Sequence, residues 1–224
     1  NEAIGIGIEK SEELVSSLTK LRVPVDMIGD MTKSVGLLSE LTGMSADSAA
    51  ELGASLHVVG GMGQESIDNM MASMVSMQEV VGFTENEMNL LGDSIKSSTQ
   101  MLSTMGKSAG EIESFNSGVV DLAGAFASVG VEAEKATQLM DELLDPGKVE
   151  DHAFLLSQLG VSMSDAFSGD LNPAELASGF RDIGTQMQNM TGPAAAAMAE
   201  QMGMSVRDLR QMGELGDKEL NSVA

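Results

Sequence analysis

The strongest constraint on the fold is a short pattern that joins one amphipathic run to the next. Residues 41–56 read L-T-G-M-S-A-D-S-A-A-E-L-G-A-S-L. Gly43 suits the left-handed position just past a helix, Met44 is the apolar residue before the next helix, and Ser45 is its N-cap. The buried face of that next helix is predicted to carry Ala49, Leu52 and Leu56. The pattern therefore predicts a corner between two helices.

The same corner recurs four times further along the chain. It reads Gly82-Phe83-Thr84, Gly130-Val131-Glu132, Gly160-Val161-Ser162 and Gly203-Met204-Ser205, and only Glu132 is a poor cap. Three corners carry an acid three residues after the cap, which predicts capping boxes in Thr84 with Glu87, Ser162 with Asp165 and Ser205 with Asp208. The spacing of the corners is too irregular for a solenoid of fixed period. We expect an all-α array or bundle of about ten short amphipathic helices joined by Gly-hydrophobic-Ser/Thr corners.

Composition limits the possible partners and the kind of core. Among 224 residues, 12 are basic and 34 acidic, which gives a net charge of -22. Such a chain is repelled by phosphate backbones and anionic lipid surfaces, so we expect no direct nucleic-acid binding. The absence of cysteine excludes disulfides and thiolate metal sites. With 19 Met and neither Trp nor Tyr, the core is predicted to be filled by aliphatic and thioether side chains.

Breaker residues predict three regions. Residues 1–24 are expected to form an N-terminal tail and a first helix that Ser11 caps and Pro24 ends, residues 25–145 a helical array, and residues 146–224 a second helical region after Pro146-Gly147. The alternation in residues 4–8 is consistent with a short strand or with an apolar tail docked on a partner. Because the chain begins with Asn1, we expect a processed product or an excerpt of a longer protein.

Two runs have apolar residues on alternating steps of three and four, which is typical of helix-packing faces. Gly118 and Gly124 in the first run are expected to permit close approach of a neighbouring helix. We predict that the two faces pack within a subunit or between copies of the chain. The first face comprises Ile112, Phe115, Val119, Leu122, Phe126 and Val129, and the second Leu176, Phe180, Ile183, Met187 and Met190.

Metal, phosphate and cofactor sites are not indicated. His57 and His152 lack the spacing of zinc ligands, so His57 is expected at a helix C-terminus and His152 on a solvated acidic turn. Residues 60–63 are rich in glycine, but they lack the spacing and lysine of a phosphate loop, which favours a turn. Residues 141–150 hold acids without the alternation of a calcium loop. We expect no cofactor and no metal.

One enzymatic alternative rests on Glu113-Ser114, since a Glu-Ser pair on a helix opens the motif of lytic transglycosylases. In those enzymes the glutamate is the general acid, which requires an apolar cleft that raises its pKa. The downstream Gly-Leu-Met-Gln segment is missing here, as are Tyr and Trp for a sugar groove. Glu113 is therefore predicted to be a solvated helix residue, and no catalytic residue is expected.

Four stretches contain the corners: L-T-G-M-S-A-D-S-A-A-E-L-G-A-S-L at 41–56, V-G-F-T-E-N-E-M-N-L-L at 81–91, V-G-V-E-A-E-K-A-T-Q-L-M at 129–140 and M-G-M-S-V-R-D-L at 202–209. In these stretches the chain resembles the helical segments of phage tail tape measure proteins. The resemblance covers most of the chain from Leu38 onward. The long uninterrupted heptads of the ruler portion are absent, which favours a globular or hub-bound region.

The resemblance implies a structural role in the virion. It suggests several copies packed in the tail tube, where they set tail length, bind the baseplate hub and leave ahead of the DNA at genome ejection. Partners would be copies of the chain, tail tube proteins and hub proteins, with possible host membrane contact during ejection. The implied location is the phage tail, preceded by the host cytoplasm during assembly.

Three other classes remain open from the sequence. A membrane-active pore former would use the Gly- and Ala-rich apolar stretches, although the acidic charge argues against it at neutral pH. A helical adaptor or scaffold module unrelated to phages would have much the same sequence. A cell-wall hydrolase is the least favoured class.

Overall fold

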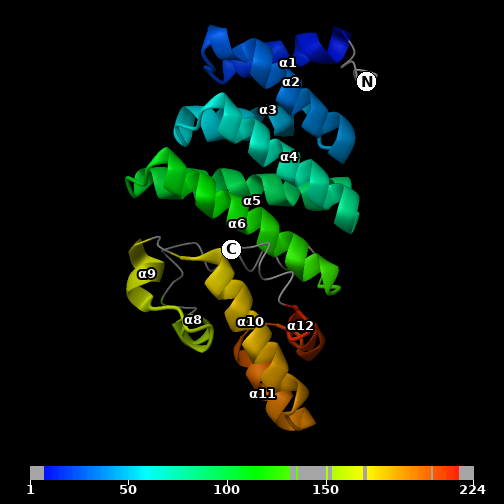
Figure 1. Ribbon diagram of the computed structural model, residues 1–224, viewed down its shortest axis with the longest axis vertical. Helices are drawn as coiled ribbons and strands as arrows, with labels where there is room; N and C mark the ends of the chain where they lie inside the picture. Colours follow the sequence, from blue (N-terminus) through cyan, green and yellow to red (C-terminus); the bar gives the residue numbers. More distant parts are fainter. Residues whose placement is uncertain are drawn as a thin grey trace. The chain divides into compact units, whose positions relative to one another are not determined.

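The computed structural model describes residues 8–131, 135, 150, 153–168, 171–202 and 204–216. Within these residues the chain forms eleven α-helices and one π-helical turn, and no strand (Figure 1). The fold is therefore all-α, as the recurring corners predicted. None of the helices in the described part is both long and apolar enough to cross a membrane.

The described residues belong to two compact units, Asn1–Ser117 and Gly118–Ala224. The division falls inside a single helix, α6 (Ala109–Ser128). The boundary predicted at Pro146-Gly147 lies outside the described residues, and so does the apolar tail through Gly7. Helix breakers mark where one helix ends, whereas compact units follow from which helices pack together, and the two need not coincide.

In the first unit, α2 occupies a central position. The unit comprises α1 (Ile8–Lys20), α2 (Val25–Thr42), α3 (Ala46–Ala54), α4 (Gln64–Val81), α5 (Glu85–Thr104) and the first part of α6. Helix α2 packs against α1, α3 and α4, and α5 packs against α3 (Figure 1). The α2 face is buried, as the periodicity of its apolar residues requires; it comprises Ile28, Met31, Val35 and Leu38.

The start of α1 differs from the expectation. Ser11 was expected to cap this helix, but α1 begins at Ile8, so Ser11 lies within it. A serine inside a helix costs only about 0.5 kcal/mol relative to alanine, which the preceding helix-compatible residues and the buried Leu14 and Leu18 can offset. Proline at position 24 stands between α1 and α2, as expected.

Two corners in the first unit have the predicted geometry. Gly43 and Gly82 adopt left-handed φ values of 77° and 78°, which glycine reaches without steric cost. Ser45 Oγ accepts a hydrogen bond from the amide of Ser48 at 3.0 Å. At the second corner the capping box is complete, because Thr84 Oγ1 accepts from the Glu87 amide at 3.3 Å while the Thr84 amide donates to Glu87 Oε2 at 2.8 Å.

A π-helical turn, Ser55–Val59, follows α3. The amide of Gly60 donates to the carbonyl of Ser55 at 3.0 Å, which closes the wider turn. His57 lies in this π-helical turn at the end of the helix, as expected, with its Nδ1 2.8 Å from the carbonyl oxygen of Met62. The glycine-rich residues after it form a turn, in which Gly61 has a φ of 67°.

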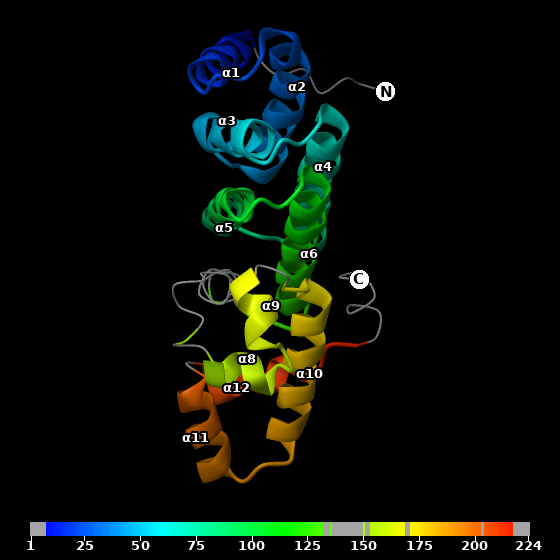
Figure 2. The ribbon, with the colours of Figure 1, turned by 90° about the vertical axis from the view of Figure 1, so that its left-hand side faces the viewer.

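The second unit is organised around α10 (Pro173–Gln188), against which α12 (Val206–Met212) packs (Figure 2). It also contains the second part of α6, α8 (Ala153–Gln158), α9 (Met163–Ser168) and α11 (Gly192–Gln201). Asn172 caps α10 through a 3.0 Å bond from the amide of Ala174, with Pro173 at the first helical position.

The corners of the second unit follow the pattern in part. The hydroxyls of Ser162 and Ser205 accept from the amides of Asp165 and Asp208, at 3.1 Å and 3.0 Å. The Asp208 carboxylate, however, accepts from Lys135 Nζ at 3.2 Å. Tertiary packing therefore gives this acid a partner that a local capping rule does not anticipate.

Methionine fills much of the core, as the composition predicted. All of the following side chains are buried, and the most exposed of them keeps 8% of its surface accessible. They are Met31, Met44, Met62, Met70, Met71, Met74, Met77, Met88, Met187, Met202 and Met212.

Candidate functional site

The first predicted packing face lies along α6. Five of its six side chains are buried, and Val129, one residue past the helix, is partly exposed. The buried ones are Ile112, Phe115, Val119, Leu122 and Phe126. These side chains are covered within the chain itself, so they form part of its core.

The second predicted face lies along α10 and has the same character. Leu176, Phe180, Ile183 and Met187 are buried, whereas Met190 lies beyond the helix and is partly exposed. The periodic spacing thus identified inward-facing residues along the helix and was less informative at its end, where the 3.6-residue period no longer applies.

Residues of both faces meet in the second unit, at what we term the α6–α10 seam: Gly118, Phe126, Pro173 and Phe180. The rings of Phe126 and Phe180 meet edge to face, with centroids 5.3 Å apart and ring planes at 87°. Gly118 lies against Pro173, because a Cβ added to it would come within 2.6 Å of the proline ring. This agrees with the expectation that Gly118 permits close approach of another helix.

Sequence reasoning missed a second close approach, between α10 and the end of α12. A Cβ on Gly213 would lie 2.5 Å from the backbone carbonyl carbon of Gly184, and a Cβ on Gly184 would overlap the Gly213 backbone. Only glycines at both positions allow this contact. The sole signal in the sequence was a glycine inside an otherwise regular helical pattern.

A buried polar cluster joins α5 to the first part of α6. Ser98 Oγ donates to Asn116 Oδ1 at 2.7 Å, and Asn116 Nδ2 donates to Thr99 Oγ1 at 2.8 Å. Asn116 and Thr99 are completely buried. Ser98 interrupts an apolar stripe in the sequence, and the cluster supplies the reason, because a buried amide needs hydrogen-bonding partners.

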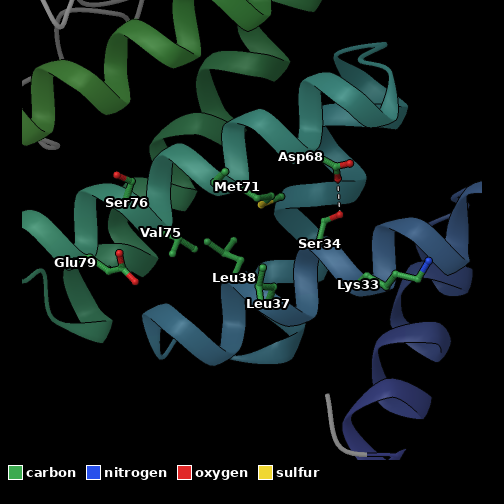
Figure 3. Close-up of a pocket in the computed structure, with 10 residues that line it drawn as sticks. Lys33, Ser34, Leu37, Leu38, Asp68, Met71, Val75, Ser76 and Glu79 are labelled. Carbon is green, nitrogen blue, oxygen red and sulfur yellow. Dashed lines mark hydrogen bonds between the residues drawn. The ribbon is translucent and has the colours of Figure 1, made fainter. Parts of the chain in front are cut away.

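The described part of the first unit holds a cavity between α2 and α4 (Figure 3), which we term the α2–α4 groove. Its volume is about 420 Å³. The lining residues are Lys33, Ser34, Leu37 and Leu38 from α2, with Asp68, Met71, Ala72, Val75, Ser76 and Glu79 from α4. Leu37 keeps 39% of its surface accessible, which makes the groove an open apolar surface with polar ends.

Polar side chains at one end of the groove hydrogen bond to one another. Ser34 Oγ donates to Asp68 Oδ1 (Figure 3). Gln64 Nε2 donates to the same oxygen at 2.7 Å. Lys33 Nζ lies 2.8 Å from Asp30 Oδ1, and this hydrogen bond and the charge of Asp30 raise the pKa of Lys33 above 10.5. The groove therefore offers apolar surface and charge rather than a set of free hydrogen-bonding groups.

The residues considered for chemistry do not assemble into a reaction centre in the described part of the chain. Glu113 was expected to be solvated, but it is partly buried and its Oε2 accepts from Ser66 Oγ at 2.7 Å. No group of three or more metal-ligating side chains occurs among the described residues. His152 and the acids from Asp141 to Asp145 lie outside them.

Comparisons with protein-family models and with curated proteins find no match to this sequence.

Proposed function

We propose that this chain is a structural segment of a phage tail tape measure protein, from a globular or hub-bound region rather than from the extended ruler. The observation that carries the proposal is the repeated corner in which a left-handed glycine ends one helix and a Ser or Thr hydroxyl caps the next. Gly82 and Thr84 form it completely. The sequence resemblance rests on the same corners.

Packing of the helices supports a structural role. Most side chains of the two periodic faces are buried within the chain, and glycines permit close contact of Gly118 with the ring of Pro173 and of Gly184 with the backbone of Gly213. Small residues and a methionine-rich core let helices repack at modest cost in free energy. Such a module suits a protein that is packed during assembly and rearranges when the genome leaves. Its net charge of -22 disfavours adhesion to DNA.

The test uses tailed particles produced from the genome that encodes the chain. Mass spectrometry should find the chain in purified tails, and electron microscopy should find altered tail length or tail yield when its segment is deleted in frame. Intact tails that lack the chain, or deletion particles with normal tails, would overturn the proposal.

Two point variants separate a packing requirement from a general effect of mutation. Phe180→Ala removes one ring of the α6–α10 seam and should lower the yield of tails. Phe154→Ala removes a ring of the same size that is 45% exposed on α8, so the yield should be unchanged.

A further inference from the structure

We infer that the α2–α4 groove binds an amphipathic helix of another protein, one whose apolar stripe is flanked by lysine or arginine. This inference is independent of the proposed function, because it rests only on the shape and charge of the groove. The occupant would place apolar side chains on Leu37 and Val75 (Figure 3) and on Ala72.

The length of the groove indicates a helical occupant. Its lining on α4 extends from Asp68 to Glu79, eleven residues later, which corresponds to roughly 16 Å at 1.5 Å per residue. Lining residues recur at helical spacing on both walls, and the apolar ones are Leu37 and Leu38 on α2 and Met71, Ala72 and Val75 on α4. A third helix can present side chains at i, i+4 and i+7 to such a trough.

Charge specifies the kind of helix. The groove is lined by the carboxylates of Asp68 and Glu79, and its single lining cation, Lys33, is already paired with the carboxylate of Asp30. Asp68 at one end and Glu79 at the other both lie on α4, so they would face the flank of a bound helix that runs along α4 (Figure 3). Positively charged flanks complement these carboxylates, whereas acidic flanks would be repelled.

The same charge argues against a second copy of this chain as the occupant. Each copy carries a net charge of -22, with only 12 basic residues among 224. Association of two such chains through an acidic groove would bring like charges together. The partner is therefore a different protein, whose docking helix has basic flanks.

The experiment measures binding of the full chain to three fluorescein-labelled 14-residue peptides by fluorescence anisotropy. The first has a leucine stripe at i, i+4, i+7 and i+11 flanked by lysine, the second replaces lysine by glutamate, and the third keeps the lysines but scrambles the leucines. We expect saturable binding of the first, weakened at least tenfold in the other two. Absence of saturable binding, or equal binding of the scrambled peptide, would overturn the inference.

Matched variants locate the binding site. Ala72→Gln fills the exposed floor of the groove without changing the charge and should weaken binding at least tenfold, whereas Ser73→Gln, on the exposed side of the same helix, should leave it within twofold. Glu79→Gln should weaken binding severalfold, and Glu65→Gln, outside the groove, should not. Circular dichroism checks that each variant is folded. Equal effects of the paired variants would contradict a site in the groove.

Sedimentation velocity tests the other occupant. If the chain self-associates at all, we expect Ala72→Gln to leave that association unchanged. Self-association that is lost in Ala72→Gln and kept in Ser73→Gln would assign the groove to a second copy and overturn the inference.

Discussion

Phe126 on α6 and Phe180 on α10 meet edge to face, with their ring centroids 5.3 Å apart. Both side chains are fully buried, so each ring contributes burial as well as a specific ring contact. The pair therefore joins the two helices whose faces were predicted from sequence.

Replacement of either ring should destabilise the fold strongly. We expect Phe180→Ala to lower the free energy of unfolding by about 3–5 kcal/mol, because it removes a fully buried ring and leaves a cavity. Urea unfolding followed by circular dichroism measures this, since the chain has no Trp or Tyr for fluorescence. Phe154→Ala, at a half-exposed ring, should cost far less.

A double-mutant cycle with Phe126→Leu and Phe180→Leu should show a coupling of about 0.5–1.5 kcal/mol, and additive effects would contradict a specific ring contact.

The contact between Gly184 and Gly213 predicts opposite outcomes for two identical substitutions. Gly184→Ala should destabilise the chain by about 1–3 kcal/mol, because the new methyl group overlaps the backbone of the neighbouring segment. Gly29→Ala, in α2, has no atom near the new methyl group and should stabilise by about 0.5–1 kcal/mol through helix propensity. Thermal unfolding of both variants measures the difference. Stabilisation by Gly184→Ala would show that α10 and α12 are not in backbone contact.

The buried amide of Asn116 should contribute to stability through its partners. Asn116→Ala leaves the hydroxyl of Thr99 without its amide donor and should cost about 1–3 kcal/mol, in addition to the lost packing. Asn69→Ala, at an exposed position on α4, removes an amide of the same size and should be neutral or slightly stabilising. Urea unfolding compares the two variants. Equal effects would argue that the cluster of Ser98, Thr99 and Asn116 contributes nothing specific.

Burial raises the pKa of the Asp121 carboxyl on α6 above its ordinary value of 3.8. The folded state therefore binds this proton more tightly than the unfolded state does. Above the pKa that Asp121 has in the folded state, its carboxyl is charged and lowers the free energy of unfolding. This loss disappears as the pH falls through that pKa toward 3.8. Asp121→Asn should raise the urea midpoint at pH 7, and its advantage over the unmodified chain should shrink in acid.

The control for this pH dependence is Glu13→Gln, the same chemical change at an exposed position on α1. It should change the midpoint little at either pH, as surface substitutions usually do. An advantage of Asp121→Asn that persists unchanged in acid would contradict titration of the buried carboxyl.

Much of the helical layout could be predicted because its signals are local. A glycine ends one helix, and the Ser or Thr two residues later caps the next through hydrogen bonds among neighbouring residues, as at Gly82 and Thr84. The 3-4 spacing of apolar residues likewise identified which side of α6 and α10 faces inward, since a helix rotates by a constant angle per residue.

The choice of partners could not be predicted in the same way. Nothing near Phe126 in the sequence specifies Phe180, and nothing near Gly184 specifies Gly213. One local feature was also overlooked: the capping box at Ser108, whose amide donates to Glu111 Oε2 at 2.8 Å, has the Ser-x-x-Glu spacing that predicts it. The α2–α4 groove was missed because the sequence of each wall predicts only an ordinary amphipathic helix.

By itself the sequence determined the all-α class, the positions of most corners and the inward faces of the longer helices, because capping and periodicity depend on residues within a few positions of one another. Only the tertiary structure decided which faces meet, where the compact units divide within α6, and that α2 and α4 leave an open groove between them. These features depend on contacts between residues far apart in the chain, whose pairing is selected by shape and burial rather than by any local pattern.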